Sequence, residues 1–285
     1  MTASGSPNSQ PLKVPNLSAS AGAIDTHIHF YDKKYPLAPT AIAPAPDGSV
    51  DSYRAVQRRL GLARCVVVQP SAYGTDNRCT LEGIEKFGRR HARGVAVVDT
   101  RVSDAALAEM TEAGIRGARF HMLPGGAIGW DILDSVAARV QAVGWHVQLQ
   151  LDGRLLPERE AQIKSWPGRV VIDHVGKFLE PVAPDHTAFK CLLRFVESGR
   201  VWVKLSAPYE VSKFGPPLYG DVGRLAKILV KTAPERMLWA SNWPHPSVKD
   251  KPDEAMLLDL LLDWAPDAAT RQRILVDNPA ELYGF

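Results

Sequence analysis

Two histidines stand one residue apart at the end of a short apolar run, in the segment DTHIH at residues 25–29. On a β-strand, side chains at i and i+2 point to the same face, so His27 and His29 can face one site. Imidazole binds a metal ion or hydrogen-bonds to the carbonyl of a substrate. The segment IDHVGK at residues 172–177 ends another apolar run and offers a third imidazole, His174. We therefore predict a catalytic cluster of three histidines, against the alternative of ordinary polar residues at strand ends or in the core.

Cationic side chains follow other apolar runs. Arg119 lies in the segment RGARFH at residues 116–121, where the arginine and the last histidine share a face. The planar guanidinium group matches a carboxylate, so we predict that Arg119 binds a carboxylate of the substrate. Lys177 or Lys204 is predicted to supply a second cation. The alternative for Arg119 is a salt bridge at the surface.

Neutral polar side chains also gather at the ends of these runs. Ser71, Tyr73 and Asn77 follow one of them, and Gln148 and Gln150 lie in another. Hydroxyl and amide groups of this kind bind a hydroxyl-rich ligand. We assign all five residues to substrate binding.

Eight strands are predicted, and a segment with helical periodicity follows each of them. Strand followed by helix, eight times within 285 residues, favours an α/β fold of the (β/α)8 barrel class over an open doubly wound sheet. Polar residues at the strand C-termini then meet at one face of the barrel, where such folds place their chemistry. The predicted strands are 23–30, 64–69, 94–98, 117–121, 146–151, 170–174, 201–205 and 237–241, and the predicted helices are 50–60, 80–91, 104–113, 130–143, 155–166, 187–198, 219–232 and 253–264.

The composition is that of an ordinary globular protein, with 45% hydrophobic and 23% charged residues. We predict one barrel domain over residues 21–285 and a flexible lead-in over residues 1–20. The formal net charge of +3 is spread without a basic block, which argues against nucleic acid as a partner. No apolar run is long enough to span a membrane. Three cysteines without paired spacing predict a cytoplasmic protein, and a homo-oligomer stays open.

A family resemblance emerges when the segment at residues 242–246, NWPHP, is added to these motifs. Together they resemble the amidohydrolase superfamily and, within it, the 2-pyrone-4,6-dicarboxylate lactonase group. The resemblance runs from about residue 22 to residue 246, in the order GAIDTHIHF, YGTDN, RGVAVVD, RGARF, GWHV, VIDHVGK and NWPHP. It implies a TIM barrel and lactone chemistry.

The metal ligands of metal-dependent amidohydrolases are only partly matched. His27, His29 and His174 correspond to such ligands, but Gln148 or Gln150 stands where the fifth strand supplies a histidine. Arg119 stands on the fourth strand, and its permanent charge opposes a cation. We therefore predict a site without metal and without any other cofactor.

A second departure concerns the base that activates water. The resemblance implies an aspartate at the position of Asn242, and an amide cannot take a proton from water. General-base help contributes ~10²–10⁴-fold, so hydrolysis should be weak. The second arginine and the tyrosine of the lactonase group fall at Gly125 and Gln150, which suits a polyol better than a flat aromatic diacid.

Intramolecular acyl transfer survives the loss of this base, because a hydroxyl of the substrate attacks its own lactone carbonyl at high effective molarity. Within the family this corresponds to D-galactarolactone isomerase activity, which interconverts D-galactaro-1,5-lactone and D-galactaro-1,4-lactone. In this hypothesis the three histidines surround the carbonyl and one of them shuttles the proton. Asn242 orients a hydroxyl or the tetrahedral intermediate.

Three alternatives stay open. A lactonase that uses another base would open a sugar-acid lactone or 2-pyrone-4,6-dicarboxylate to the free acid. A metal-dependent hydrolase would contain stoichiometric zinc and lose activity to chelators. A barrel that only binds sugar acids would be stabilised by ligand without turnover, so activity that His174→Ala removes would exclude it.

Overall fold

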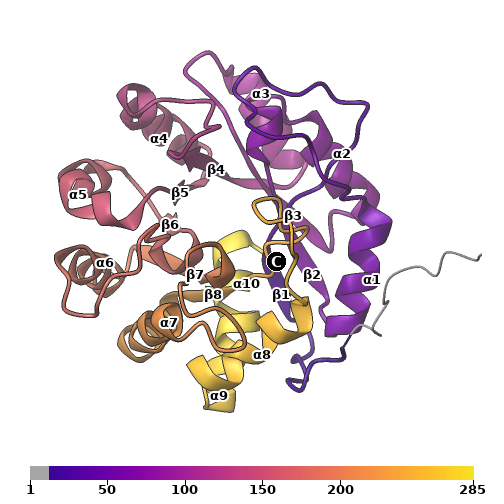
Figure 1. Cartoon of the computed structure of the whole chain (residues 1–285). Coiled ribbons are helices and arrows are strands. Elements are labelled where there is room, and N and C mark those ends of the chain that lie inside the picture. Colours follow the sequence, from indigo (N-terminus) through magenta and orange to yellow (C-terminus); the bar gives the residue numbers. More distant parts are fainter. Residues whose placement is uncertain (1–12) are drawn as a thin grey trace, which may run out of the picture.

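The eight strands form one parallel sheet in the order β1 to β8, and the helices surround it (Figure 1). The structure is a computed structural model that describes residues 13–285. The strands are β1 Ile24–Ile28, β2 Arg64–Val68, β3 Ala92–Ala96, β4 Ile115–His121, β5 His146–Gln150, β6 Val170–Ile172, β7 Val201–Leu205 and β8 Met237–Trp239. The helices are α1 Val50–Leu60, α2 Arg78–Phe87, α3 Asp104–Glu112, α4 Leu133–Ala142, α5 Leu156–Ser165, α6 Thr187–Glu197, α7 Gly220–Thr232, α8 Glu254–Trp264, α9 Ala268–Gln272 and α10 Asn278–Tyr283. The predicted (β/α)8 barrel is confirmed.

The barrel closes between β1 and the segment that follows β8. The Asn242 N–H donates to the His27 carbonyl oxygen at 3.0 Å, and the His29 N–H donates to the Trp243 carbonyl oxygen at 2.8 Å. Ile28 and Trp243 form a parallel bridge there. This closure brings two chain segments more than 200 residues apart into direct contact at the mouth of the barrel.

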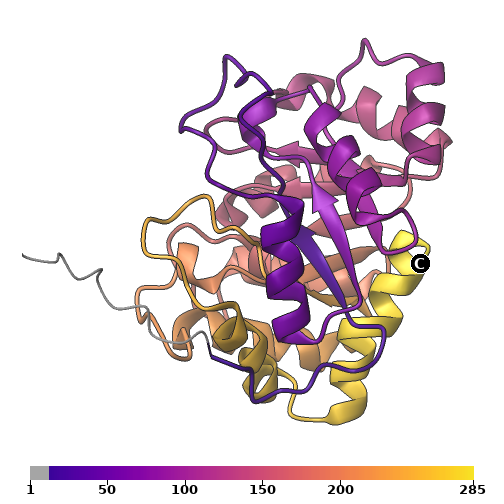
Figure 2. The ribbon, with the colours of Figure 1, turned by 90° about the vertical axis from the view of Figure 1, so that its right-hand side faces the viewer.

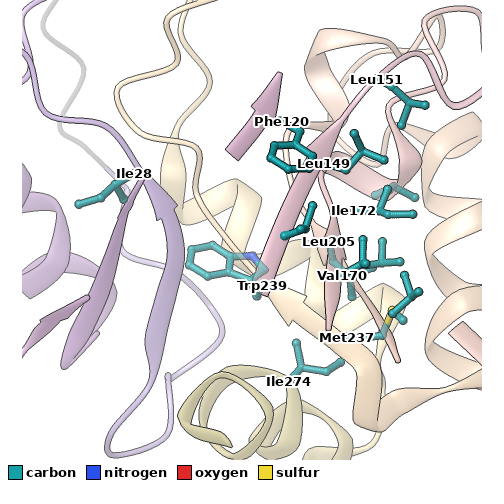
Figure 3. Close-up of a cluster of buried hydrophobic side chains, with 14 of the residues drawn as sticks. Ile28, Phe120, Leu149, Leu151, Val170, Ile172, Leu205, Met237, Trp239 and Ile274 are labelled. Carbon is teal, nitrogen blue, oxygen red and sulfur yellow. The ribbon is translucent and has the colours of Figure 1, made fainter. Parts of the chain in front are cut away.

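Alternate residues of the strands supply two hydrophobic clusters. In β2, Cys65 and Val67 belong to the large cluster between strands and helices, whereas Val66 and Val68 belong to a smaller cluster inside the barrel. This is the two-residue period expected of a strand. Figure 3 shows part of the large cluster, with Ile172 and Met237 among its members.

The floor of the barrel is closed by chain that follows the eighth helix. After α9, a π-helical turn at 273–277 leads into α10, which begins with proline in its first turn. Leu282 and Tyr283 of α10 join the inner cluster, and the Tyr283 ring packs edge-on against His146 at 5.2 Å. Figure 2 shows this yellow segment beside the lower part of the barrel. The sequence prediction ended at residue 264 and missed these helices, because α9 has five residues and α10 has six.

The predicted lead-in covers residues 1–20, and residues 1–12 of it lie outside the described part of the chain. Residues 13–20 run along α8, where the backbone N–H groups of Asn16 and Leu17 donate to the Asp259 carboxylate at 3.1 and 2.8 Å. Leu17 is buried. Within the described chain, every helix is too short or too polar to cross a lipid bilayer.

Two substitutions at Tyr283 test the role of the C-terminal helix. Its ring is fully buried, but its hydroxyl has no hydrogen-bond partner among the described residues. Tyr283→Ala should lower the free energy of unfolding by about 3–5 kcal/mol, because it empties the floor of the barrel. Tyr283→Phe should raise it by about 1 kcal/mol, because an unpaired buried hydroxyl is costly. Urea denaturation followed by circular dichroism measures both, and equal effects would contradict this assignment.

Candidate active site

A cavity of about 430 Å³ opens at the C-terminal ends of the strands. Ile42, Ala43, Pro44 and Pro46 of the long loop after β1 form one wall, and Figure 2 shows this indigo loop at the end to which the strand arrows point. The polar side chains that line the cavity come from the ends of seven strands, all except β3: His29, Tyr31, Ser71, Arg119, His121, Gln150, His174, Lys177, Glu210, Asn242 and Ser247.

His29 lines the cavity, and His27 lies below it. The Nε2 atoms of the two rings are 3.3 Å apart. His29 Nδ1 is 2.7 Å from the Val68 carbonyl oxygen, which can only accept, so this nitrogen carries the proton. The Nε2 atom of a neutral His29 is then an acceptor, and His27 donates to it. Both histidines point inward because residues i and i+2 of a strand share a face.

Lys204 and Asp173 lie beneath the histidines, inside the barrel. Lys204 Nζ donates to the Thr26 carbonyl oxygen at 2.7 Å and to Gln148 Oε1 at 2.8 Å, and it lies 3.7 Å from Asp173 Oδ1. It is also 3.3 Å from His27 Nδ1, which accepts a hydrogen bond in the tautomer deduced above. Burial lowers the pKa of Lys204 to about 8, so most of it is charged at neutral pH. Burial alone would raise the pKa of Asp173, but Lys204 holds it below the ordinary value.

His174 lies at the turn that follows β6. Its φ angle of 55° and that of Val175, also 55°, are left-handed, a strained conformation for both residues. The turn places the His174 ring 5.0 Å from the His27 ring, and Nδ1 lies 2.8 Å from Ser206 Oγ. If Ser206 donates, Nε2 carries the proton toward the cavity.

All three imidazoles are neutral at physiological pH. Burial lowers the pKa of His29 to about 3, with a further contribution from Arg119. Burial also lowers the pKa of His27 and His174 well below the ordinary value. These rings therefore donate and accept hydrogen bonds, and they are weak proton acceptors.

Arg119 is held on the opposite side of the cavity. Its Nη1 donates to the Gln69 carbonyl oxygen at 2.8 Å, and its Nη2 donates to Gln150 Oε1 at 2.7 Å. Its Nε has no partner among residues 13–285. Nη1 and Nη2 each keep a second N–H, and the carboxylate binding predicted for Arg119 stays a prediction. Gln150 also lies 3.3 Å from His121, so it orients two cavity residues.

One carboxylate in the cavity was missed by the sequence analysis. Glu210 ends the short 3-10 helix after β7, its side chain forms an ion pair with Lys177, and its Oε1 lies 3.2 Å from Asn242 Nδ2. The sequence analysis identified the loss of a base at residue 242 but not this neighbouring acid group. In a (β/α)8 barrel the loop after each strand lies at the mouth. This rule, applied to the loop after the seventh strand, would have identified Glu210.

Four predicted binding residues lie outside the cavity. Gln148 and Lys204 are fully buried and hydrogen-bonded to each other. Tyr73 accepts from the Asp32 N–H at 3.0 Å, and Asn77 bridges to Val97 through its amide. Tyr73 and Asn77 hold loops, whereas Ser71 does line the cavity.

The donors present do not fit a metal ion. In the described part of the chain, donor atoms of His27, Asp173 and His174 lie within 4.8 Å of one another. The Lys204 ammonium group is 3.3 Å from His27 Nδ1 and 3.7 Å from Asp173 Oδ1. A cation shared by these atoms would sit beside a positive charge in a buried site, which is costly.

Known proteins resemble this chain in sequence and in fold. Residues 24–285 match the family described as amidohydrolase. The chain belongs to the amidohydrolase family. This amidohydrolase is 35% identical to the D-galactarolactone isomerase of Agrobacterium fabrum over 94% of this chain and 93% of that protein. It is 36% identical to the 2-pyrone-4,6-dicarboxylate hydrolase of Comamonas testosteroni, over 94% and 92%. An apo crystal structure from Agrobacterium tumefaciens aligns with a TM-score of 0.90 and 35% identity, over 95% of this chain and 96% of that chain. The resemblance deduced from the motifs is confirmed, and the protein is an enzyme.

The ion pair below the histidines can be tested by stability. Lys204→Met in this amidohydrolase leaves the Asp173 carboxylate buried without its cation, and the free energy of unfolding should fall by about 3–5 kcal/mol. Lys190→Met on α6, an exposed position, is the control and should change it by less than about 0.5 kcal/mol. Urea denaturation measures both. A loss below about 1 kcal/mol for Lys204→Met would show that the pair does not carry the predicted charge.

Proposed function

We propose that this amidohydrolase interconverts D-galactaro-1,5-lactone and D-galactaro-1,4-lactone by intramolecular acyl transfer, without a metal ion. The observation that carries the proposal is the amide of Asn242 in the cavity, at the position where the resemblance implies an aspartate base. The similarity to a D-galactarolactone isomerase supports it. Three buried cysteines without disulfides fit a reducing compartment, so we place the reaction in the cytoplasm.

The charge of the cavity supports a substrate with one carboxylate. Arg119 and Lys177 are cations, Glu210 is an anion, and the histidines are neutral, which leaves one net positive charge. A monolactone of an aldaric acid carries one free carboxylate, whereas 2-pyrone-4,6-dicarboxylate carries two. In this proposal Arg119 binds the free carboxylate.

The other side of the cavity suits the reacting carbonyl. His174 offers an Nε2–H donor there when Ser206 donates to its Nδ1. A donor aimed at the carbonyl oxygen stabilises the oxyanion that forms when the substrate hydroxyl attacks. His29 is held in this wall by hydrogen bonds to His27 and to the Val68 carbonyl oxygen. The hydroxyl belongs to the substrate, so attack needs no captured water.

The orientation of the Asn242 amide follows from its partners. Glu210 Oε1 is a carboxylate oxygen and only accepts, so the Asn242 atom 3.2 Å from it is the NH₂ group. The same nitrogen donates to the Tyr209 hydroxyl at 2.9 Å. Both N–H donors are thereby engaged, which leaves Asn242 Oδ1 to accept from a hydroxyl of the substrate or of the intermediate.

Lactone hydrolysis is the second candidate function. Glu210 favours it, because a carboxylate beside Asn242 could take a proton from water. The similarity to a 2-pyrone-4,6-dicarboxylate hydrolase favours it as well. The single net positive charge of the cavity matches a substrate with one carboxylate, and the amide at residue 242 cannot take a proton from water. Both observations argue for isomerisation.

An NMR time course on purified D-galactaro-1,5-lactone tests the two functions. We expect the 1,4-lactone to appear before open galactarate, because internal attack outcompetes water. Metal content is measured on the same sample, and activity should survive a chelator. Prompt release of galactarate would contradict isomerisation. Stoichiometric zinc, with activity lost to the chelator and restored by zinc, would contradict the metal-free site.

Asn242→Asp should raise the ratio of hydrolysis to isomerisation, because it adds a carboxylate that can activate water. The new carboxylate would lie beside Glu210 Oε1, and two adjacent carboxylates raise the pKa of one of them. The gain should therefore be larger at pH 8 than at pH 6. NMR quantification of galactarate against 1,4-lactone measures the ratio, with enzyme-free samples subtracted. A ratio equal to that of the unmodified enzyme at both pH values would exclude Asn242 as the residue that withholds water activation.

A further inference from the structure

Glu210 is presented to the cavity by a specific backbone turn. Strand β7 ends at Leu205, Ala207 adopts a left-handed conformation with φ of 47°, and the 3-10 helix of 208–210 follows. The Glu210 side chain, 4% exposed, then reaches the ammonium group of Lys177 and the amide of Asn242. These two partners come from the ends of β6 and β8, so Glu210 lies between them at the mouth.

The neighbours of Glu210 hold its carboxylate in one orientation. Tyr209 accepts from Asn242 and therefore donates to His245 Nδ1 at 2.8 Å. His245 Nε2 then carries the proton and faces Glu254 Oε1 at 3.2 Å. This chain of hydrogen bonds fixes Asn242, and Asn242 in turn fixes Glu210 Oε1. The carboxylate is thus preorganised, and it still has lone pairs for a substrate hydroxyl.

The histidines are poor carriers of the proton in comparison. His27 lies below the cavity, with Nε2 bonded to His29 and Nδ1 facing Lys204. His29 donates its Nδ1 proton to the Val68 carbonyl oxygen, and its Nε2 accepts from His27, so both ring nitrogens are engaged. His174 is neutral and suits the role of a donor to the oxyanion. Acyl transfer still needs a group that accepts one proton and gives it back.

We propose that Glu210 is the proton carrier of the acyl transfer, an inference that rests on the proposed function. Its carboxylate takes the proton of the attacking hydroxyl as the new bond from that oxygen to the carbonyl carbon forms. The tetrahedral intermediate then collapses, the bond from the carbonyl carbon to the ring oxygen breaks, and Glu210 returns the proton to that oxygen. No proton, electron pair or water molecule is gained or lost over the cycle.

The substrate itself makes one carboxylate sufficient. Conversion of a 1,5-lactone into a 1,4-lactone moves the acyl group between oxygens on neighbouring carbon atoms. The attacking oxygen and the leaving oxygen therefore lie side by side, within reach of one fixed carboxylate. Lys177 keeps Glu210 ionised in its resting state and ready to accept.

The test compares Glu210→Gln with the unmodified enzyme and with Glu180→Gln, an exposed position outside the cavity. Glu210→Gln should lower kcat for isomerisation by ~10²–10⁴-fold, as expected for a lost acid-base group. Its KM should not rise, because Lys177 is freed from its anion and the cavity becomes more positive. The Kd for D-galactarate, an open-chain diacid that cannot isomerise, should stay unchanged or fall, which reports that the variant is folded. Glu180→Gln should keep the kcat of the unmodified enzyme.

Glu210→Asp provides a second variant, because it keeps a carboxylate on a side chain that is shorter by one methylene. It should retain a higher kcat than Glu210→Gln. A kcat for Glu210→Gln within threefold of the unmodified enzyme, or equal kcat values for the Asp and Gln variants, would overturn the assignment of Glu210 while the proposed function stands. If the unmodified enzyme releases galactarate without forming the 1,4-lactone, the proposed function fails and the assignment fails with it.

Discussion

An ammonium group and a carboxylate, Lys204 and Asp173, lie 3.7 Å apart inside the barrel with no exposed surface. Each charge is costly to bury alone, and together the two charges form an ion pair beneath the histidines of the site. Lys204 binds Gln148 and the backbone at Thr26, and its charge faces His27. Burial and this positive charge keep His27 neutral, and its Nδ1 faces Lys204 while its Nε2 donates to His29. The same charge makes the position unsuitable for a metal ion.

The Asn242 amide is the feature on which the proposed isomerisation depends. Barrel closure places the Asn242 backbone on His27, so its side chain enters the mouth beside the histidines. Tyr209, His245 and Glu254 then fix which end of the amide faces the substrate. Among the described residues that line the cavity, the acid group is Glu210, which follows a different strand and is paired with Lys177. In the proposed mechanism the acid group therefore comes from the end of β7, whereas the resemblance implies one at the end of β8.

The sequence predicted the barrel well because each strand is a local pattern, and strand ends converge in any closed parallel sheet. His29, His174, Arg119 and Asn242 could be placed at the mouth for this reason. Depth along a strand is harder to predict: Lys204 precedes the end of β7 by one residue and points into the core. Tyr73 and Asn77 fold back on their own loop. The strand-end rule places Glu210 at the mouth, but it does not indicate the pairing of Glu210 with Lys177, 33 residues away. Such pairings follow from the assembled fold, so no local pattern indicates them.

The floor and the seam of the barrel join its first strand to segments that come much later in the sequence. Strand β1 completes its pairing with residues 242–243, and Leu282 and Tyr283 complete the inner cluster from below. Until these long-range contacts form, Ile24, Val66 and Val171 have no cover from below. Loss of the C-terminal helix would therefore expose apolar side chains of β1, β2 and β6 to solvent, even with all eight strands present.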